Sequence, residues 1–329
     1  MGITSCSNNF YKKKLNLKQG LVIKSTGSWF TVESENGELF ECKIKGKFRI
    51  KDIKSTNPVA VGDHVEFSIQ SASNDRNVGL ITSISERKNY IIRRSQNLSK
   101  QSHIIAANID QAVLVVTLYF PVTTTTFIDR YLASAEAYRI PVLIIFNKTD
   151  RLNQVQLNER NSLIDVYTKI GYHCISTSAT TLLGIDSLKE SLKNKINVFN
   201  GHSGVGKSTL INILEPGLKL KTMDISDIHN TGKHTTTYSA LYKLNFGGYI
   251  IDTPGIKAFG MLEMEAWEIS HYFPEIFKMS AKCQYNNCSH THEPGCAVKN
   301  AVAKNEIAKS RFTSYLGLLE TDDKYRPAF

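Results

Sequence analysis

Residues 20–88 alternate between apolar and polar positions in short runs that are separated by turn residues. Because the side chains of a β-strand point alternately to its two faces, such runs predict strands with one buried face. The Asn36-Gly37 pair between two of the runs predicts a tight hairpin turn, since both residue types tolerate positive φ angles. Several short strands within about 70 residues indicate a small all-β barrel.

The apolar pattern changes after this region. Long apolar runs and shorter mixed runs predict further strands at 109–118, 140–146, 172–179, 196–199 and 242–252. The segments between these strands are helical in composition, and one of the helices is closed by Gly171. Strands that alternate with helices predict a mostly parallel α/β sheet. The segments 263–280 and 296–320 then predict helices without strands.

These changes divide the chain into a tail (1–19), a barrel (20–88), a polar and basic linker (89–103), an α/β domain (104–265) and a helical domain (266–329). A chain of 329 residues is long enough for such a division. It has no run of 18 apolar residues, and its first residues lack the apolar core of a signal peptide. We therefore expect a cytoplasmic protein without a membrane partner. We also expect the chain to be a monomer.

The net charge of +10 favours an anionic partner and is concentrated at the N-terminal end of the chain. In the alternating segment 43–51 every basic residue falls on one strand face, the basic stripe: Lys43, Lys45, Lys47, Arg49 and Lys51. An ordinary solvated strand face would explain such a pattern. However, five like charges without an acid between them repel one another, so we interpret the stripe as an anion-binding surface, with RNA as the favoured ligand.

The segment GHSGVGKS at 201–208 matches a phosphate-binding loop between a strand and a helix. Glycines allow backbone N–H groups to surround phosphates, and the helix directs its N-terminus at the anion. Lys207 would contact the outer phosphates and assist catalysis, and the Ser208 hydroxyl would bind Mg²⁺. The predicted nucleotide contacts are Gly201, His202, Ser203, Gly204, Val205, Gly206, Lys207, Ser208 and Thr209.

The segment NKTD at 147–150 follows a buried strand and predicts a guanine-binding loop. The Asp150 carboxylate can accept two hydrogen bonds from the donor edge of guanine, which adenine lacks, and this argues against an ATPase or a nucleotide kinase. Asn147 and Lys148 would fix the loop and flank the base. Ser178-Ala179 would add a backbone N–H to the base oxygen. This loop precedes the phosphate loop, the reverse of the usual GTPase order.

Two further segments predict contacts to the γ-phosphate and Mg²⁺. In DTPG, Asp252 would hold Mg²⁺ through water, and the Gly255 N–H would meet the γ-phosphate. In GKHTTT, a threonine would bind Mg²⁺; we favour Thr236, with both neighbouring threonines as alternatives. No glutamine follows DTPG to position the attacking water, so His234 is the best nearby candidate for that role.

The chain has six cysteines, and the last three are clustered near histidines. A tight cluster of this kind in a cytosolic chain favours a metal site over disulfides. Three thiolates and one imidazole predict a closed, structural zinc site, with His292 as a competing fourth ligand. The predicted ligands are Cys283, Cys288, His290 and Cys296.

Taken together, the motifs resemble the circularly permuted GTPases of the RsgA family, which assist small ribosomal subunit biogenesis. The resemblance covers about residues 20–310 and rests on the order NKTD, Ser-Ala, GHSGVGKST, GKHTTT and DTPG, between a basic barrel and the Cys/His cluster. One departure is Lys257-Ala258-Phe259, where an Arg-Glu-Phe sequence is more usual in the family.

The resemblance implies a multidomain fold: an N-terminal all-β OB-fold barrel, a permuted P-loop GTPase domain and a helical zinc-binding domain. It implies hydrolysis of GTP to GDP and phosphate, stimulated by the small ribosomal subunit, during late subunit maturation and with binding to its rRNA. It points to His234 as the catalytic histidine and to His290 as the zinc ligand. A non-catalytic RNA-binding protein regulated by GTP is the alternative. Because DTPG runs directly into the helical domain, we also expect loss of the γ-phosphate to act on that domain through the chain.

Overall fold

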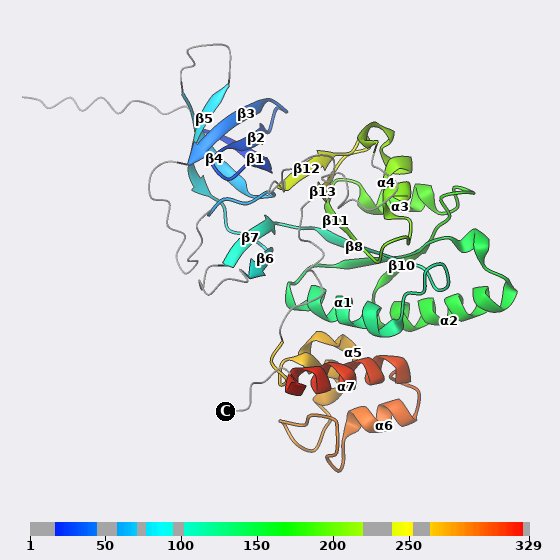
Figure 1. Cartoon of the computed structure of the whole chain (residues 1–329). Helices are drawn as coiled ribbons and strands as arrows, with labels where there is room; N and C mark the ends of the chain where they lie inside the picture. The colour runs from blue at the N-terminus through cyan, green and yellow to red at the C-terminus, as the bar shows by residue number, and fades with distance from the viewer. Residues whose placement is uncertain are drawn as a thin grey trace, which may run out of the picture.

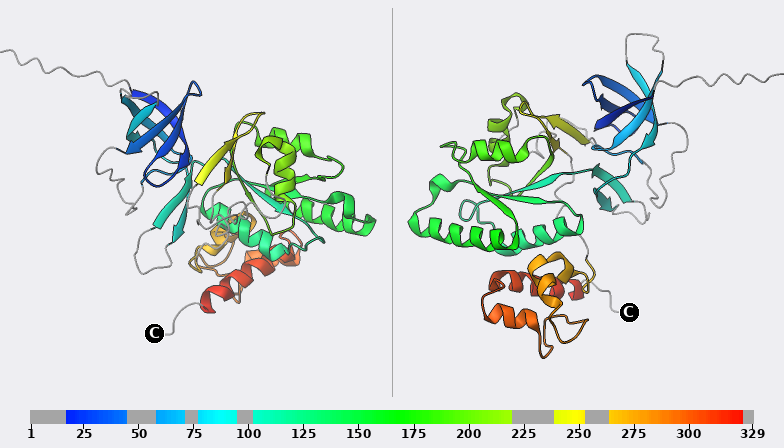
Figure 2. Two further views of the ribbon diagram at one scale, coloured as in Figure 1. Left: turned by 45° about the horizontal axis from the view of Figure 1, so that its top comes forward. Right: turned by 180° about the vertical axis from the view of Figure 1, so that it is seen from behind.

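The structure is a computed structural model that describes residues 17–44, 58–70, 77–94, 102–219, 239–252 and 264–324. These residues form an N-terminal barrel, a central α/β domain, and a C-terminal group of helices that lies below helices α1 and α2 of the central domain (Figure 1). Two further views show the barrel and the C-terminal helices at different sides of the central domain (Figure 2). Among the helices within the described ranges, none is long and apolar enough to cross a membrane.

The barrel confirms the predicted OB-like fold. Its described strands are β1 (Leu17–Ser25), β2 (Phe30–Ser34), β3 (Leu39–Ile44), β4 (His64–Gln70) and β5 (Val78–Ile84). They are hydrogen-bonded in the order β1-β2-β3-β5-β4, and β4 pairs again with β1, which closes the barrel. The predicted turn joins β2 to β3, with Gly37 at a φ of 78°. Alternate residues face inward, and the rings of Phe40 and Phe67 pack at 5.0 Å between centroids.

The central domain is a mostly parallel sheet, as predicted. Strands β8 (Gln111–Val116), β9 (Val142–Phe146), β10 (His173–Ser176), β11 (Ile196–Asn200) and β13 (Tyr249–Asp252) run parallel in the order β10-β9-β8-β11-β13. Helices α1 (Thr125–Ala137) and α2 (Gln154–Ile170) lie on one side of the sheet, and α3 (Ile185–Leu192) and α4 (Lys207–Leu214) on the other (Figure 1). Gly171 ends α2 at a φ of 117°, which confirms the predicted helix end.

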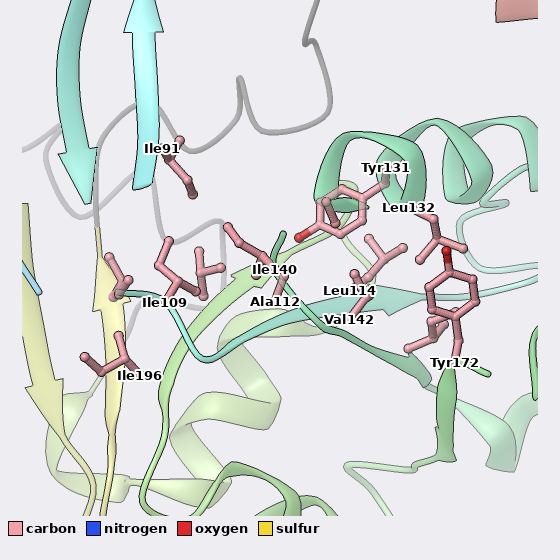
Figure 3. Packing of buried hydrophobic residues seen from close by; sticks show 14 of the residues in the cluster. Ile91, Ile109, Ala112, Leu114, Tyr131, Leu132, Ile140, Val142, Tyr172 and Ile196 are labelled. Carbon is pink, nitrogen blue, oxygen red and sulfur yellow. The ribbon is translucent and has the colours of Figure 1, made fainter. Parts of the chain in front are cut away.

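The sheet has an apolar core on each face, which explains the continuous apolar runs. In β8, Leu114 packs with the α1 and α2 side, whereas Val113 and Val115 pack with the α3 and α4 side. Figure 3 shows the first of these clusters, with Tyr131 and Leu132 reaching it from α1. A strand that is buried on both faces carries apolar residues on both, so its sequence lacks the alternation of apolar and polar residues that marks a half-buried strand.

Two parts of the sequence interpretation were wrong in detail. The segment 89–103 contains β6 (Tyr90–Arg94) and the start of β7 (Ser102–Ala107), which pair as an antiparallel hairpin. An isolated two-stranded hairpin is marginally stable, but this one is anchored by Ile91, which packs in the core of the central domain (Figure 3). The segment 242–252 is not one strand: β12 (Ser239–Lys243) turns back into β13 through Gly247 and Gly248, both at positive φ.

The predicted C-terminal helical segments are each interrupted. The first forms a 3₁₀ turn (Ile269–Tyr272) and α5 (Pro274–Ser280), because Pro274 is compatible with the first turn of a helix but not with its interior. The second forms α6 (Ala297–Ala303) and α7 (Lys309–Lys324), with Asn305 between them at a φ of 57°. Their core includes Phe273 and Tyr315 and also Ala133 of α1, so these helices pack directly on the central domain.

The barrel and the central domain share one sheet. Strand β12 pairs on one side with β13 and on the other with β1, so the described strands form a continuous eleven-stranded sheet. Glu33 of the barrel accepts a hydrogen bond from the Tyr249 hydroxyl at 2.8 Å and pairs with Lys243. The junction is therefore made by backbone pairing that side-chain contacts reinforce.

Candidate functional site

The candidate nucleotide site is built by loops at one edge of the central sheet. The guanine loop (147–150) follows β9, Ser178-Ala179 follows β10, and the phosphate loop (201–208) follows β11. Because these strands are parallel, their carboxyl ends meet at the same edge. The spatial arrangement of the loops is therefore independent of their unusual order along the chain.

Glycines shape the phosphate loop. Gly201, Gly204 and Gly206 all have positive φ angles, and a Cβ atom at Gly201 would lie 2.2 Å from the Val115 carbonyl oxygen. Helix α4 begins directly after Gly206, with Lys207 and Ser208 in its first turn. The Lys207 ammonium donates to the carbonyls of Gly201 (2.9 Å) and His202 (2.7 Å). The loop therefore presents a cation and a helix N-terminus together.

The guanine loop is tied directly to the phosphate loop. Asn147 is buried and donates from Nδ2 to the Val205 carbonyl at 2.8 Å. Lys148, which adopts a left-handed conformation, donates from Nζ to the Gly204 carbonyl at 2.5 Å. Burial and the neighbouring charge of Arg151 lower the pKa of Lys148. The two predicted motifs thus form one site, and the polar parts of Asn147 and Lys148 hold its shape.

The Asp150 carboxylate is oriented by a residue whose role the sequence did not reveal. The Ser178 hydroxyl donates to Asp150 Oδ1 at 2.6 Å and accepts from the Thr181 N–H at 3.1 Å. The Ser178 N–H donates to the Leu183 carbonyl at 3.0 Å, so this N–H is already engaged within the protein. A two-residue motif indicates the position of a loop, but it does not indicate which of the loop's polar atoms form hydrogen bonds within the protein.

The loops enclose one pocket of about 250 Å³. Asp150 and Ala179 line its guanine end, and Gly206, Lys207 and Ser208 line its phosphate end. Arg151, Thr180 and Lys148 also line it, and the first two had no sequence motif to mark them. The pocket therefore brings together the groups expected to bind a base and those expected to bind phosphates.

Several predicted site residues lie outside the described part of the chain. These include His234, Thr236 and Gly255, and four members of the basic stripe, Lys45, Lys47, Arg49 and Lys51. Asp252 ends strand β13 at the same sheet edge as the phosphate loop, but its side chain is not described. Lys43 is exposed, and its ammonium lies 4.2 Å from the ring centroid of Trp29.

A candidate metal centre lies in the C-terminal helices. The ligand atoms of Cys283, Cys288, His290 and Cys296 all lie within 4.8 Å of one another. His290 Nδ1 is 3.7 Å from Cys283 Sγ and 3.5 Å from Cys296 Sγ. The competing candidate, His292, is exposed, and its Nδ1 lies 2.9 Å from the Thr291 hydroxyl. The four predicted residues can therefore hold a metal ion together.

Comparison with known proteins identifies the family. A family model described as RsgA GTPase matches residues 84–262, and a model of the RsgA N-terminal domain matches residues 19–78. The chain belongs to the RsgA GTPase family. A curated relative from Bacteroides fragilis (strain YCH46), the small ribosomal subunit biogenesis GTPase RsgA, is 59% identical over 94% of this chain and 100% of its own length. The RsgA relative from Flavobacterium johnsoniae is 56% identical over 93% of this chain and 94% of its own length.

Two solved structures have the same architecture as this chain. YjeQ from Thermotoga maritima is 37% identical and matches with a TM-score of 0.77 over 94% of this chain and 100% of its own. YloQ, described as a circularly permuted GTPase, is 28% identical and matches with a TM-score of 0.74 over 99% of this chain and 100% of its own. This RsgA family member is therefore a GTP-hydrolysing enzyme with a permuted order of loops.

Proposed function

We propose that the enzyme hydrolyses GTP during late maturation of the small ribosomal subunit, that the subunit stimulates this hydrolysis, and that the chain binds ribosomal RNA. The proposal is supported by the pocket that Asp150 and the phosphate loop both line, because a carboxylate able to accept from guanine and groups able to bind phosphates share one cavity. The relatives from Bacteroides fragilis and Flavobacterium johnsoniae are named small ribosomal subunit biogenesis GTPases, which supports the biological step.

Within the site, the residues have distinct proposed roles. The phosphate-loop N–H groups and Lys207 bind the phosphates and stabilise the charge that develops as the β–γ bond breaks. Mg²⁺ bound with GTP would neutralise phosphate charge, and Ser208, Thr236 and, through water, Asp252 would hold it. Gly255 would meet the γ-phosphate, and His234 would orient the attacking water. Asp150 gives specificity, because its carboxylate accepts from guanine and is already oriented by Ser178.

The metal centre is proposed to bind one structural zinc ion. Zn–S bonds of about 2.3 Å and a Zn–N bond of about 2.0–2.1 Å, at tetrahedral angles, separate sulfur from nitrogen by about 3.5–3.6 Å. The observed separations from His290 Nδ1 to the Cys283 and Cys296 sulfurs are 3.7 and 3.5 Å. Three thiolates and one imidazole complete a closed donor set, and such a set has no open position for catalysis.

The basic stripe is proposed to bind rRNA. Lys43 is exposed beside the partly exposed ring of Trp29, so the edge of the stripe offers both a cation and an aromatic face. Reversing the charges from Lys43 to Lys51 is expected to weaken RNA binding and to flatten its dependence on salt, because fewer counterions are released. If the salt dependence is unchanged, the stripe does not bind RNA.

The deciding experiment measures GTP turnover with and without purified small ribosomal subunits, for the wild type and for Lys207→Ala. Faster wild-type turnover with subunits and its loss in Lys207→Ala support the proposal. Turnover that is independent of subunits contradicts the proposed stimulation. If RNA binding by Lys207→Ala responds to GTP as in the wild type while hydrolysis is lost, then GTP acts as a regulatory ligand and hydrolysis is not required for that step.

A further inference from the structure

Helix α1 lies between the central sheet and the C-terminal helices (Figure 1). Tyr131 packs in the sheet core, whereas Ala133 packs in the core of the C-terminal helices. Asp129 and Tyr131 are two positions apart, which is about 200° around a helix, so they lie on opposite faces. Most surface helices bury a single stripe, but α1 is buried on both of these faces.

On its sheet side, α1 contacts the phosphate loop. The Phe127 ring packs on the His202 ring, with 3.8 Å between centroids and 33° between planes. Asn200, the last residue of β11 before the loop, donates from Nδ2 to the Tyr131 hydroxyl at 3.0 Å. The carbonyl of the stacked His202 also accepts from Lys207 at 2.7 Å. Burial and the Lys207 charge lower the pKa of His202, which favours a neutral ring against Phe127.

On its other side, α1 is fixed to α7 by a buried ion pair. Arg311 has 1% of its side chain exposed and donates from Nη1 to Asp129 Oδ1 at 2.9 Å. Its remaining nitrogens bind Glu275 of α5 at 2.7 and 3.1 Å. Loss of one partner from a buried ion pair leaves an uncompensated charge, which is strongly unfavourable. The C-terminal helices therefore have little freedom to move on α1 while Asp129 and Arg311 are paired.

We infer that α1 couples the phosphate loop to the C-terminal helices, with Phe127 and Arg311 as positioning residues at its two contacts. A nucleotide that orders the phosphate loop also favours the position in which the C-terminal helices are docked on α1. In turn, docking of these helices on α1 favours the conformation of the phosphate loop that binds nucleotide. Thermodynamic linkage requires the effect to be the same in both directions. This inference needs nucleotide binding alone and is independent of the proposed ribosomal step.

The inference differs from the route expected through DTPG. That route depends on the γ-phosphate, so it separates GTP from GDP. The α1 route begins at the loop that surrounds the inner phosphates, so GDP is sufficient. The two routes therefore give different results with the two nucleotides.

Hydrogen exchange of the wild type tests the inference without any substitution. Saturating GDP should increase the protection of amides in α5 and α7 by about threefold or more beyond that in β4 and β5 of the barrel. The barrel amides are the reference, because a bound ligand stabilises the whole folded state. Equal protection in both regions would overturn the inference, and excess protection with a non-hydrolysable GTP analogue alone would favour the DTPG route instead.

A double-mutant cycle on the Kd of fluorescent GDP tests the path. Arg311→Lys keeps the charge but loses the planar fork that bridges Asp129 and Glu275, and Phe127→Leu removes the ring that stacks on His202. Each single substitution should raise the Kd for GDP by about threefold or more. If the two residues act on one path, the Kd of the double variant should be at least about twofold lower than the value obtained by multiplying the two single fold-changes.

Tyr315→Phe is the matched control, because its hydroxyl binds the Ser289 carbonyl within the C-terminal helices and not α1. It should lower the melting temperature without changing the Kd for GDP. The inference fails if Arg311→Lys likewise lowers only the melting temperature, because Arg311 is then a structural residue alone. It also fails if the fold-change in the Kd for GDP of the double variant equals the product of the two single fold-changes.

Discussion

Asp150→Asn is the sharpest test of the guanine site. The carboxylate is exposed in the pocket, and Ser178 holds its Oδ1 at 2.6 Å. Asparagine keeps an oxygen that can accept from Ser178, so its amide nitrogen would face the base. The hydrogen-bond donors of guanine would then face the amide N–H donors of asparagine, where they had faced the accepting oxygens of the Asp150 carboxylate. Xanthine presents a carbonyl at that position and would be the better partner.

The magnitude follows from the bonds that are lost. A hydrogen bond to a charged group contributes about 1.5–3 kcal/mol. Because Asp150 is open to solvent, we take the lower value for each of two bonds. The loss is then about 3 kcal/mol, which is about 150-fold in the Kd for GDP. A gain of the same order is expected for xanthosine diphosphate.

Competition binding with a fluorescent nucleotide measures both affinities. Ser178→Ala is the control, since it removes the orienting hydroxyl but keeps the carboxylate. It should cost about 0.5–1.5 kcal/mol, or about 2- to 13-fold for GDP, with no gain for the xanthine nucleotide. If Asp150→Asn lowers the affinity for GDP by less than about fivefold, or does not raise the affinity for the xanthine nucleotide, Asp150 does not contact the base.

Three further predictions concern the phosphate loop, the metal centre and the barrel. Gly206→Ala should weaken GDP binding by about 30-fold or more, because its φ is 99° and the new Cβ would lie 2.4 Å from Asn147 Nδ2. Cys288→Ser should lower the content of bound metal below one equivalent per chain and lower the melting temperature, as a metal-release assay and thermal unfolding would show. Arg87→Met should cost about 3–5 kcal/mol in urea unfolding, because it leaves buried Asp63 without the guanidinium that binds it at 2.6 Å.

Each prediction has a matched control. Gly217→Ala, at a glycine without a positive φ, should leave GDP affinity unchanged. His292→Ala should keep the metal, because His292 is exposed and outside the four-residue cluster. Lys18→Met breaks a partly exposed ion pair with Glu38 and should cost less than about 1 kcal/mol. Equal effects of a variant and its control would contradict the assigned contact.

The fold was predictable where the pattern was strong. Apolar runs such as 140–146 and the helix ended by Gly171 were located correctly, because a buried strand and a helix end have local signals. The hairpin of β6 and β7 was missed, since its polar sequence resembles a linker and its stability comes from Ile91 in a distant core. The turn between β12 and β13 was not predicted, because the Gly247-Gly248 pair lies inside an apolar segment that favours a single strand.

The sequence by itself determined the chemistry of the site. Turn glycines, a lysine before a helix, a carboxylate able to accept from guanine and four side chains able to hold a metal ion are each specified within a few residues. Those signals are local because backbone conformation and donor type depend on the residue and its immediate neighbours.

Only the tertiary structure decided how these pieces act on one another. Lys148 reaches the Gly204 carbonyl across 56 positions of the chain, and Arg311 reaches Asp129 across 182. No periodicity encodes such pairs, because they arise when the sheet brings loops to one edge and packs α1 between two cores. The burial of an arginine and the second face of a helix therefore had to be seen in three dimensions.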